Sequence, residues 1–210
     1  MIAIVDYGMG NLHSVSKAVE RLGAQATVTA DPQELALADA IILPGVGAFG
    51  DAMQALTETG LAGVLKELAQ SGKPLLGICL GMQLLFERSE EHGKHTGLGL
   101  LRGRVVRFEP GAYKVPHMGW NELIWKQPKH ELVEKLPEGY VYFVHSYHAL
   151  AEEAADVVAV CDYAGREVTA IVGRQNVYGM QFHPEKSGQL GMQLLQQFLN
   201  AVATRGAMKA

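Results

Sequence analysis

The first half of the chain alternates short apolar segments with amphipathic ones, and this alternation constrains the fold more than any other feature. The apolar segments are "MIAIVDYG", "QATVTA", "AIILPGVG" and "PLLGIC". Short apolar runs of this kind are typical of buried parallel strands. After the first run, Leu12, Val15, Val19 and Leu22 recur at helical spacing and define one apolar face. Alternating strands and helices predict an α/β protein with a parallel sheet.

The other segments of the first half are expected to be helices. Residues 51–72, "DAMQALTETGLAGVLKELAQSG", have a helical pattern that Gly60 and Gly63 can split. Residues 80–91, "LGMQLLFERSEE", follow the fourth apolar run and are also expected to be a helix.

The pattern changes after residue 100. Strand-like segments follow one another with short turns, which indicates mixed or antiparallel sheet; they are "RVVRF", "VYFVHSYHAL", "DVVAVCDYAG", "EVTAIVG" and "VYGMQFHPE". An amphipathic helix over 188–205 closes the chain. We therefore predict a flavodoxin-like open twisted sheet, with parallel central strands, helices on both faces and an antiparallel or mixed extension from the second half. Without repeats or an obvious linker, residues 1–210 are expected to form a single domain.

Charge and cysteine content exclude several classes of function. The net charge of −4 and the lack of a basic cluster argue against nucleic-acid partners. No apolar run approaches the roughly 18 residues of a membrane-spanning helix, and the N-terminus has no basic segment of a signal peptide. Two cysteines, Cys79 and Cys161, make no disulfide framework, so a reducing compartment is expected. We expect a cytoplasmic protein with no membrane partner.

Cys79 stands in "GICLGMQ", where a strand pattern ends and a helix pattern begins. A nucleophile at such a turn is held out of the sheet and faces a helix N-terminus, whose N–H groups and dipole favour a thiolate. Gly77 and Gly81 allow the strand and the helix to approach closely. The alternative is a buried cysteine with a packing role, which is common for free thiols and is the better interpretation of Cys161.

A thiolate nucleophile needs a base, and "YGMQFHPEKS" provides one. His183 ends an apolar strand, and Glu185 lies two residues further, where an extended backbone places both side chains on one side. A carboxylate on the second imidazole nitrogen fixes the tautomer of a general base. A surface turn with an incidental ion pair is the alternative.

Acyl transfer also needs donors for an oxyanion. The glycine-rich turn "LPGVGAFG" follows the third strand, and its N–H groups, together with that of Leu80, could converge on a developing negative charge. The alternative is a tight turn that uses glycine only for steric reasons.

Together, "GICLGMQ", "PGVGAFG" and "FHPEKS" resemble the motifs of the class I (triad) glutamine amidotransferases. "VDYGMGNLHSV", "LPGVGAFGDAM", "VPHMGWNEL" and "YFVHSYHA" resemble those of one branch, the glutaminase subunits of imidazole glycerol phosphate synthase in histidine biosynthesis. The resemblance spans residues 1 to about 200.

The resemblance implies a role for each matching position. Cys79 would attack the side-chain amide of L-glutamine, His183 would pass the proton to ammonia, and Glu185 would orient His183. The implied residues for binding glutamine and the oxyanion are Gly45, Val46, Gly47, Leu80, Gln83, Ser146 and Tyr147.

The resemblance further implies a partner, a (β/α)8-barrel cyclase subunit that receives the ammonia and forms imidazole glycerol phosphate and aminoimidazole carboxamide ribotide. Five residues would face this partner, three of them on an expected loop, "PHMGWNE"; they are Asn11, Met118, Trp120, Asn121 and Tyr142. Core packing is the alternative for Trp120.

No cofactor or metal is expected. His92 and His95 are spaced like metal ligands but lack a third ligand in the sequence, and His145 and His148 are expected on opposite faces of one strand. Three other functions stay open: the glutaminase of a pyridoxal phosphate synthase, that of an anthranilate or aminodeoxychorismate synthase, and a cysteine hydrolase built on the same elbow.

Overall fold

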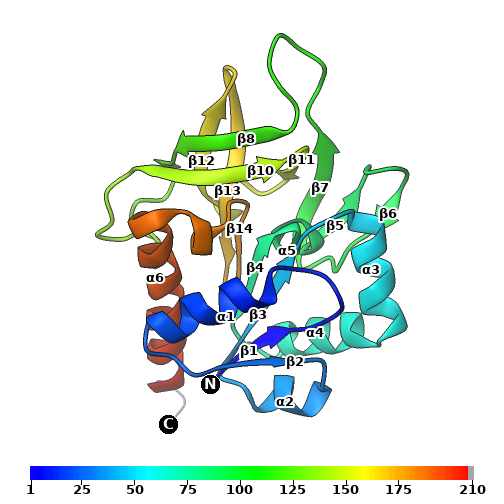
Figure 1. Ribbon diagram of the computed structural model, residues 1–210, viewed down its shortest axis with the longest axis vertical. Helices are drawn as coiled ribbons and strands as arrows, with labels where there is room; N and C mark the ends of the chain where they lie inside the picture. Colours follow the sequence, from blue (N-terminus) through cyan, green and yellow to red (C-terminus); the bar gives the residue numbers. More distant parts are fainter. Residues whose placement is uncertain (208–210) are drawn as a thin grey trace.

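A computed structural model describes residues 1–207 and contains a central eight-stranded sheet (Figure 1). The strand order is β2-β1-β3-β4-β14-β13-β12-β9, parallel from β2 to β14 and antiparallel beyond. The bounds are β1 Ile2–Val5, β2 Ala26–Thr29, β3 Ala40–Gly45, β4 Leu75–Cys79, β9 Ile124–Trp125, β12 Val157–Tyr163, β13 Arg166–Arg174 and β14 Val177–Met180. This confirms the predicted parallel sheet with an antiparallel extension.

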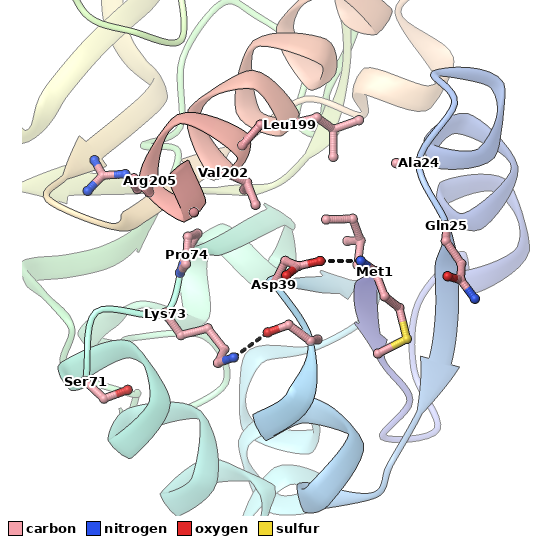
Figure 2. Close-up of a pocket in the computed structure, with 14 residues that line it drawn as sticks. Met1, Ala24, Gln25, Asp39, Ser71, Lys73, Pro74, Leu199, Val202 and Arg205 are labelled. Atoms are coloured by element: carbon pink, nitrogen blue, oxygen red, sulfur yellow. Dashed lines mark hydrogen bonds and ion pairs between the residues drawn. The ribbon is translucent and has the colours of Figure 1, made fainter. Parts of the chain in front are cut away.

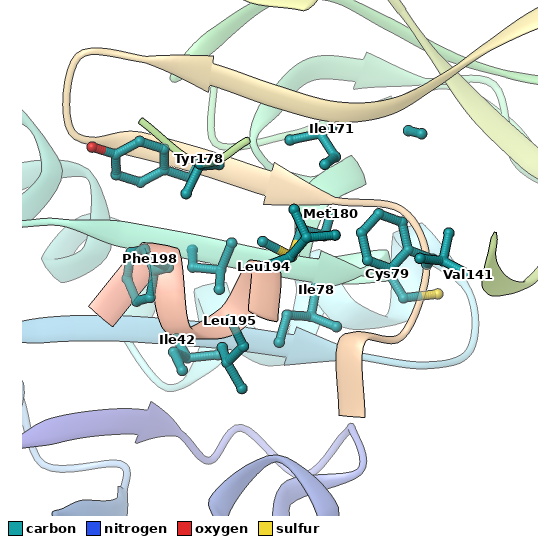
Figure 3. Close-up of a cluster of buried hydrophobic side chains, with 14 of the residues drawn as sticks. Ile42, Ile78, Cys79, Val141, Ile171, Tyr178, Met180, Leu194, Leu195 and Phe198 are labelled. Atoms are coloured by element: carbon teal, nitrogen blue, oxygen red, sulfur yellow. The ribbon is translucent and has the colours of Figure 1, made fainter. Parts of the chain in front are cut away.

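Helices cover both faces of the parallel strands, as predicted. On one face, α1 (Leu12–Arg21) and α6 (Gly188–Ala207) contribute to a core with Ile4 and Ile42. On the other, α2 (Pro32–Leu37), α3 (Phe49–Glu58) and α4 (Leu61–Gln70) pack with Val5 and Leu43. Figure 3 shows the first cluster, with Cys79 at the carboxyl end of β4. Because alternate strand residues point to opposite faces, each all-apolar strand supplies both cores.

Two smaller sheets form above the carboxyl ends of the parallel strands. One pairs β8 with β10, and the other has the order β11-β7-β5-β6. Their bounds are β5 Phe86–Ser89, β6 His95–Thr96, β7 Leu101–Arg107, β8 His117–Glu122, β10 Tyr140–His145 and β11 Tyr147–Ala151. A short 3-10 turn, η1 (Ala154–Asp156), precedes β12.

The expected helix over residues 80–91 is wrong beyond its first turn. Helix α5 spans only Leu80–Leu84, and the chain continues as β5. Strand β5 pairs in parallel with β7, with Phe86 opposite Leu101, and Phe86 is completely buried in the core. Tertiary pairing therefore overrides the local helical pattern.

The expected loop around "PHMGWNE" is also wrong. Residues His117–Glu122 form β8, paired residue by residue with β10, so that Trp120 lies opposite Tyr142. In contrast, the predicted split of the helix over 51–72 is confirmed, since Gly60 has φ +75° and separates α3 from α4. The short helix α2 had no counterpart in the sequence prediction.

No helix among residues 1–207 is long and apolar enough to cross a membrane.

Candidate active site

Cys79 is the last residue of β4 and directly precedes α5, as the elbow prediction requires. Its backbone has φ +56° and ψ −111°, a conformation that residues with a Cβ rarely adopt. Such strain is found where the surrounding structure holds a residue for function. The side chain is nearly buried, and its sulfur lies at the edge of a cleft.

The elbow depends on the two flanking glycines. A Cβ on Gly81 would lie 1.8 Å from the carbonyl oxygen of Leu43, and a Cβ on Gly77 would lie 2.5 Å from the carbonyl oxygen of Gly81. Real Cβ atoms do not approach backbone this closely, so α5 can sit against β3 and β4 only because both positions are glycine.

The glycine-rich turn after β3 lies beside Cys79. Gly45 is the register partner of Cys79, and Gly47 has φ +99°. The Tyr7 hydroxyl donates a 2.8 Å hydrogen bond to the carbonyl oxygen of Pro44, which anchors the start of the turn. Burial and the nearby Cys79 raise the pKa of Tyr7, so this donor stays protonated. The turn is thus in the place expected for an oxyanion loop.

His183 and Glu185 meet as predicted. His183 follows β14, and Glu185 lies in the 3-10 turn η2 (Pro184–Lys186). Imidazole Nδ1 is 2.8 Å from carboxylate Oε1, and the side chains are only 4% and 1% exposed. Because a carboxylate only accepts, Nδ1 carries the proton and Nε2 faces Cys79. Among the described residues, Glu185 Oε2 is buried without a hydrogen-bond partner.

The charge state of His183 follows from these neighbours. Burial alone lowers its pKa, but hydrogen bonds and charge interactions with Cys79 and Glu185 raise it, to about 9. The imidazolium form of His183 is therefore favoured beside Cys79, which places a positive charge next to the candidate nucleophile.

The turn that carries His183 is fixed to the neighbouring strand β10. The backbone N–H of His183 donates to the carbonyl of Tyr142 at 3.2 Å, and the backbone N–H of Tyr142 donates to Ser187 Oγ at 3.0 Å. Ser187 Oγ in turn donates to the carbonyl of His183 at 2.6 Å. The position of His183 thus depends on β10, which also forms the outer sheet with β8.

A cleft of about 420 Å³ gathers most of the predicted site. Its walls contain eight of the predicted residues: Cys79, His183, Val46, Gly47, Leu80, Gln83, Ser146 and Tyr147. Gly45 and Glu185 lie behind the wall, the first next to Cys79 in the sheet and the second behind His183. The residues come from four separate parts of the chain, which only the fold brings together.

The family match decides which chemistry this geometry serves. Residues 3–202 match the family described as glutamine amidotransferase class-I. The chain belongs to the class I glutamine amidotransferases.

Two relatives agree with this assignment, and one solved structure has a similar fold. A protein of Geobacillus sp. (strain WCH70) named imidazole glycerol phosphate synthase subunit HisH is 55% identical over 214 residues, 99% of this chain and 100% of the relative. A protein of the same name from Shouchella clausii is 58% identical over 203 residues, 94% and 97% of the two chains. The structure of PurLQS from Thermotoga maritima has a TM-score of 0.75 at 24% identity, covering 96% and 98%, and supports the fold.

Gln83 lines the cleft, and other parts of the protein hold its side chain. Its amide nitrogen donates to the carbonyl of Tyr147 at 2.9 Å and to Gln181 Oε1 at 3.0 Å. Both amide protons are therefore used within the protein, and only the Oε1 atom of Gln83 is left to accept a hydrogen bond from a ligand.

Several residues of the site, His145 in the cleft wall among them, were missed by the sequence analysis. Glu91 and Lys186 line the cleft, and Gln181 lies beneath it with its amide nitrogen 3.9 Å from Cys79 Sγ. Glu91 also accepts a 2.7 Å hydrogen bond from the N–H of Phe49 at the start of α3. It lies in the polar turn after β5, and nothing in its local sequence distinguishes it from a solvated residue.

The residues predicted to face a partner separate into two groups. Met118 and Trp120 are 59% and 53% exposed on β8, and Trp120 makes an edge contact with Tyr142, ring centroids 6.0 Å apart. Asn121 is half-buried and donates to the carbonyl of Asp162. Asn11 lies elsewhere, directly before α1.

The histidine pairs considered for metal binding do not form a metal site. Within residues 1–207, no group of three or more His, Cys, Asp or Glu side chains could hold a metal ion. His145 and His148 do not share a strand, since the chain bends at Ser146 and they lie on β10 and β11, which corrects the opposite-face prediction.

A larger cavity of about 570 Å³ lies at the amino ends of the parallel strands (Figure 2). There the N-terminal amine pairs with Asp39, and Lys73 donates to the carbonyls of Ala36 and Ala38. Ligands of open α/β sheets bind at the carboxyl ends of the strands. Cavity size alone would thus select the wrong end of this molecule.

Proposed function

We propose that this chain is the glutaminase subunit of an imidazole glycerol phosphate synthase. It hydrolyses L-glutamine to glutamate and ammonia, and the ammonia passes to a (β/α)8-barrel cyclase subunit of histidine biosynthesis. The observation that carries this proposal is the strained elbow of Cys79 beside the His183–Glu185 pair. The near full-length similarity to subunits of that synthase supports the choice among amidotransferases. It disfavours the other synthases and the cysteine hydrolase.

In the first half of the reaction, the Cys79 thiolate attacks the side-chain amide carbon of glutamine. Negative charge develops on the amide oxygen, where the N–H of Leu80 and an N–H of the turn after Gly45 would stabilise it. His183 gives its Nε2 proton to the amide nitrogen, the carbon–nitrogen bond breaks, and ammonia leaves a thioester on Cys79.

In the second half, water replaces ammonia. His183 takes a proton from the water as its oxygen attacks the thioester carbon, and the thiolate leaves with glutamate released. Glu185 stabilises the imidazolium in each half and fixes its orientation. One water is consumed, and one glutamate and one ammonia are formed.

The cleft offers opposite charges for the amino-acid end of the substrate. Among the described residues that line it, Glu91 is the one carboxylate and Lys186 the one lysine. We infer that Glu91 accepts hydrogen bonds from the glutamine ammonium group, while the backbone at Ser146 and Tyr147 holds the substrate chain.

Partner and cellular location belong to the same proposal. Strands β8 and β10 would face the cyclase, with Trp120 as an aromatic anchor, and residues 1–210 would act as one domain. Because the mechanism needs a free Cys79 thiolate, we propose that the protein works in the reducing cytoplasm.

The decisive experiment uses Cys79→Ala in complex with the barrel subunit. Glutamine-dependent synthesis should be abolished, while synthesis from added ammonium salt should continue at the wild-type rate. Cys161→Ala is the matched control and should retain glutamine-dependent synthesis. Glutamine use that survives in the Cys79 variant would show that another group is the nucleophile.

A further inference from the structure

Two buried histidines connect the outer sheet with the glutamine cleft. His117 on β8 and His145 on β10 are register partners, and His117 Nδ1 lies 2.9 Å from His145 Nε2. Their residues are 0% and 6% exposed. On the far side, His145 Nδ1 lies 2.8 Å from the carbonyl oxygen of Tyr147, which is part of the cleft wall.

The same carbonyl is the meeting point of a second set of hydrogen bonds. Gln83 donates to the Tyr147 oxygen and to Gln181 Oε1, and the amide nitrogen of Gln181 faces Cys79 Sγ. The contacts therefore run without interruption from β8 to the thiol.

The positions of the protons on His117 and His145 follow from which of their neighbours can only accept a hydrogen bond. A carbonyl oxygen only accepts, so His145 must carry its proton on Nδ1. The Nε2 atom of a neutral His145 is then an acceptor, and His117 must donate to it through Nδ1. Both rings are thus Nδ1–H tautomers, and the donors point from β8 towards the cleft.

At the β8 end of this series of hydrogen bonds, His117 faces a second acceptor. His117 Nε2 lies 2.8 Å from Asn121 Oδ1, which is an acceptor. The amide nitrogen of Asn121 donates to the carbonyl oxygen of Asp162. To form all three hydrogen bonds at once, the two rings would have to carry three N–H protons, and the pair would then be positively charged. Burial lowers the pKa of both histidines, that of His145 to about 3, so the pair is neutral near pH 7. We assign the missing proton to the contact with Asn121, because the Asn121 side chain can rotate away from His117, whereas the Tyr147 carbonyl is held in the backbone of β11.

The aromatic environment holds the two rings in place. His117 is stacked between Phe143 and Tyr163, with ring centroids 4.6 and 3.9 Å away. Phe108 lies 5.4 Å from His145. Buried, stacked rings lose little further freedom when they form a hydrogen bond, so the pair is preorganised.

We propose that His117 and His145 are positioning residues for glutamine hydrolysis. As a directed donor pair they hold the Tyr147 carbonyl, and through it Gln83 and Gln181, in the arrangement that receives glutamine beside Cys79. This inference rests on the proposed function but has a readout that does not depend on it.

That first readout is the tautomeric state. In protein labelled with ¹⁵N-histidine, long-range ¹H–¹⁵N correlation spectra at pH 7 should show both rings protonated on Nδ1 alone. The signals of the two rings are assigned from their loss in the variants His117→Phe and His145→Asn. An Nε2–H tautomer of His145 would overturn the proposal whether or not the protein uses glutamine.

The second readout is kinetic and uses two substitutions of similar shape. His145→Asn keeps an N–H donor near the position of Nδ1, whereas His145→Leu removes it. In the complex with the barrel subunit, His145→Leu should raise KM for glutamine about tenfold, the size of one lost hydrogen bond, with a smaller change in kcat. His145→Asn should stay within about threefold of wild type.

His148→Gln is the control, since His148 lies on the adjacent strand outside the chain of contacts, and KM should not change. Equal KM values for the asparagine and leucine variants would overturn the proposal. If His145→Leu does not fold, His117→Phe replaces it, because that variant keeps an aromatic ring in the stack and removes the donor to His145. An unchanged KM for glutamine in His117→Phe would equally overturn the proposal. A wild-type complex that releases no ammonia from glutamine would refute the proposed function instead.

Discussion

Gly45 and Cys79 are register partners on the adjacent parallel strands β3 and β4, so the glycine-rich turn leaves the sheet directly beside the sulfur. A Cβ on Gly45 would lie 2.7 Å from the Tyr7 hydroxyl and 3.0 Å from the backbone nitrogen of Gly81. The end of β3 therefore touches both the Tyr7 hydroxyl that anchors the turn and the helix that follows Cys79.

This packing predicts the effect of Gly45→Ala. The added methyl group should push the turn away from Cys79, lower the free energy of unfolding by about 1–3 kcal/mol and reduce glutaminase activity. Chemical denaturation and ammonia release measure the two effects. Gly63→Ala is the control, because a Cβ there meets nothing within 4 Å; in a helix interior it should stabilise by about 0.5–1 kcal/mol. Equal stability of the two variants would contradict the packing argument.

The raised pKa of His183 predicts how stability depends on pH. Its pKa of about 9 in the folded protein exceeds the value of about 6.5 in an unfolded chain. Its contribution is therefore fully present below about pH 6.5 and is lost as the pH rises through 9. Glu185→Gln removes a charge that raises this pKa, so the decline between pH 6.5 and 9 should become shallower. Urea unfolding across that range tests this, and identical slopes would argue against the ion pair.

The two cysteines should differ in reactivity. Burial and the nearby Asp162 raise the pKa of Cys161 to about 12, whereas Cys79 lines the cleft beside His183. In native protein at pH 7.5, iodoacetamide should modify Cys79 and leave Cys161 unmodified, as peptide mass spectrometry can show. Denatured protein, in which both thiols should react, is the control. Modification of Cys161 before Cys79 in the native state would refute the assignment.

The exposed aromatic pair on β8 and β10 predicts where the cyclase binds. Trp120→Ala should weaken binding of the barrel subunit by about 2 kcal/mol or more, as expected for a central aromatic anchor. Leu37→Ala removes a large apolar side chain that is 81% exposed on α2, and it should not affect binding. Titration calorimetry compares the two. An unchanged affinity of the Trp120 variant would move the interface away from β8.

Local sequence predicted the parts of the fold that depend on local physics. The apolar runs that form β1, β3 and β4 could be recognised as strands because a short segment of apolar residues is typical of a strand whose two faces are both buried. Gly60 ends a helix because its backbone is left-handed. The secondary structure of residues 86–89 and 117–122 was predicted wrongly, because β5 and β8 form only through pairing with β7 and β10.

The same division applies to the active site. The sequence by itself identified Cys79 as the candidate nucleophile and His183 as its candidate base, since the glycines around Cys79 and the two-residue spacing of His183 and Glu185 are local requirements. Only the tertiary structure decided that β14 lies beside β4, which brings His183 to Cys79, and that Tyr147, Gln83 and Gln181 meet beneath the cleft. The sequence did not predict a role in the site for Glu91 or for the His117–His145 pair, for the same reason. Their partners are distant in the chain, and burial turns ordinary polar residues into fixed donors and acceptors only after the sheets have formed.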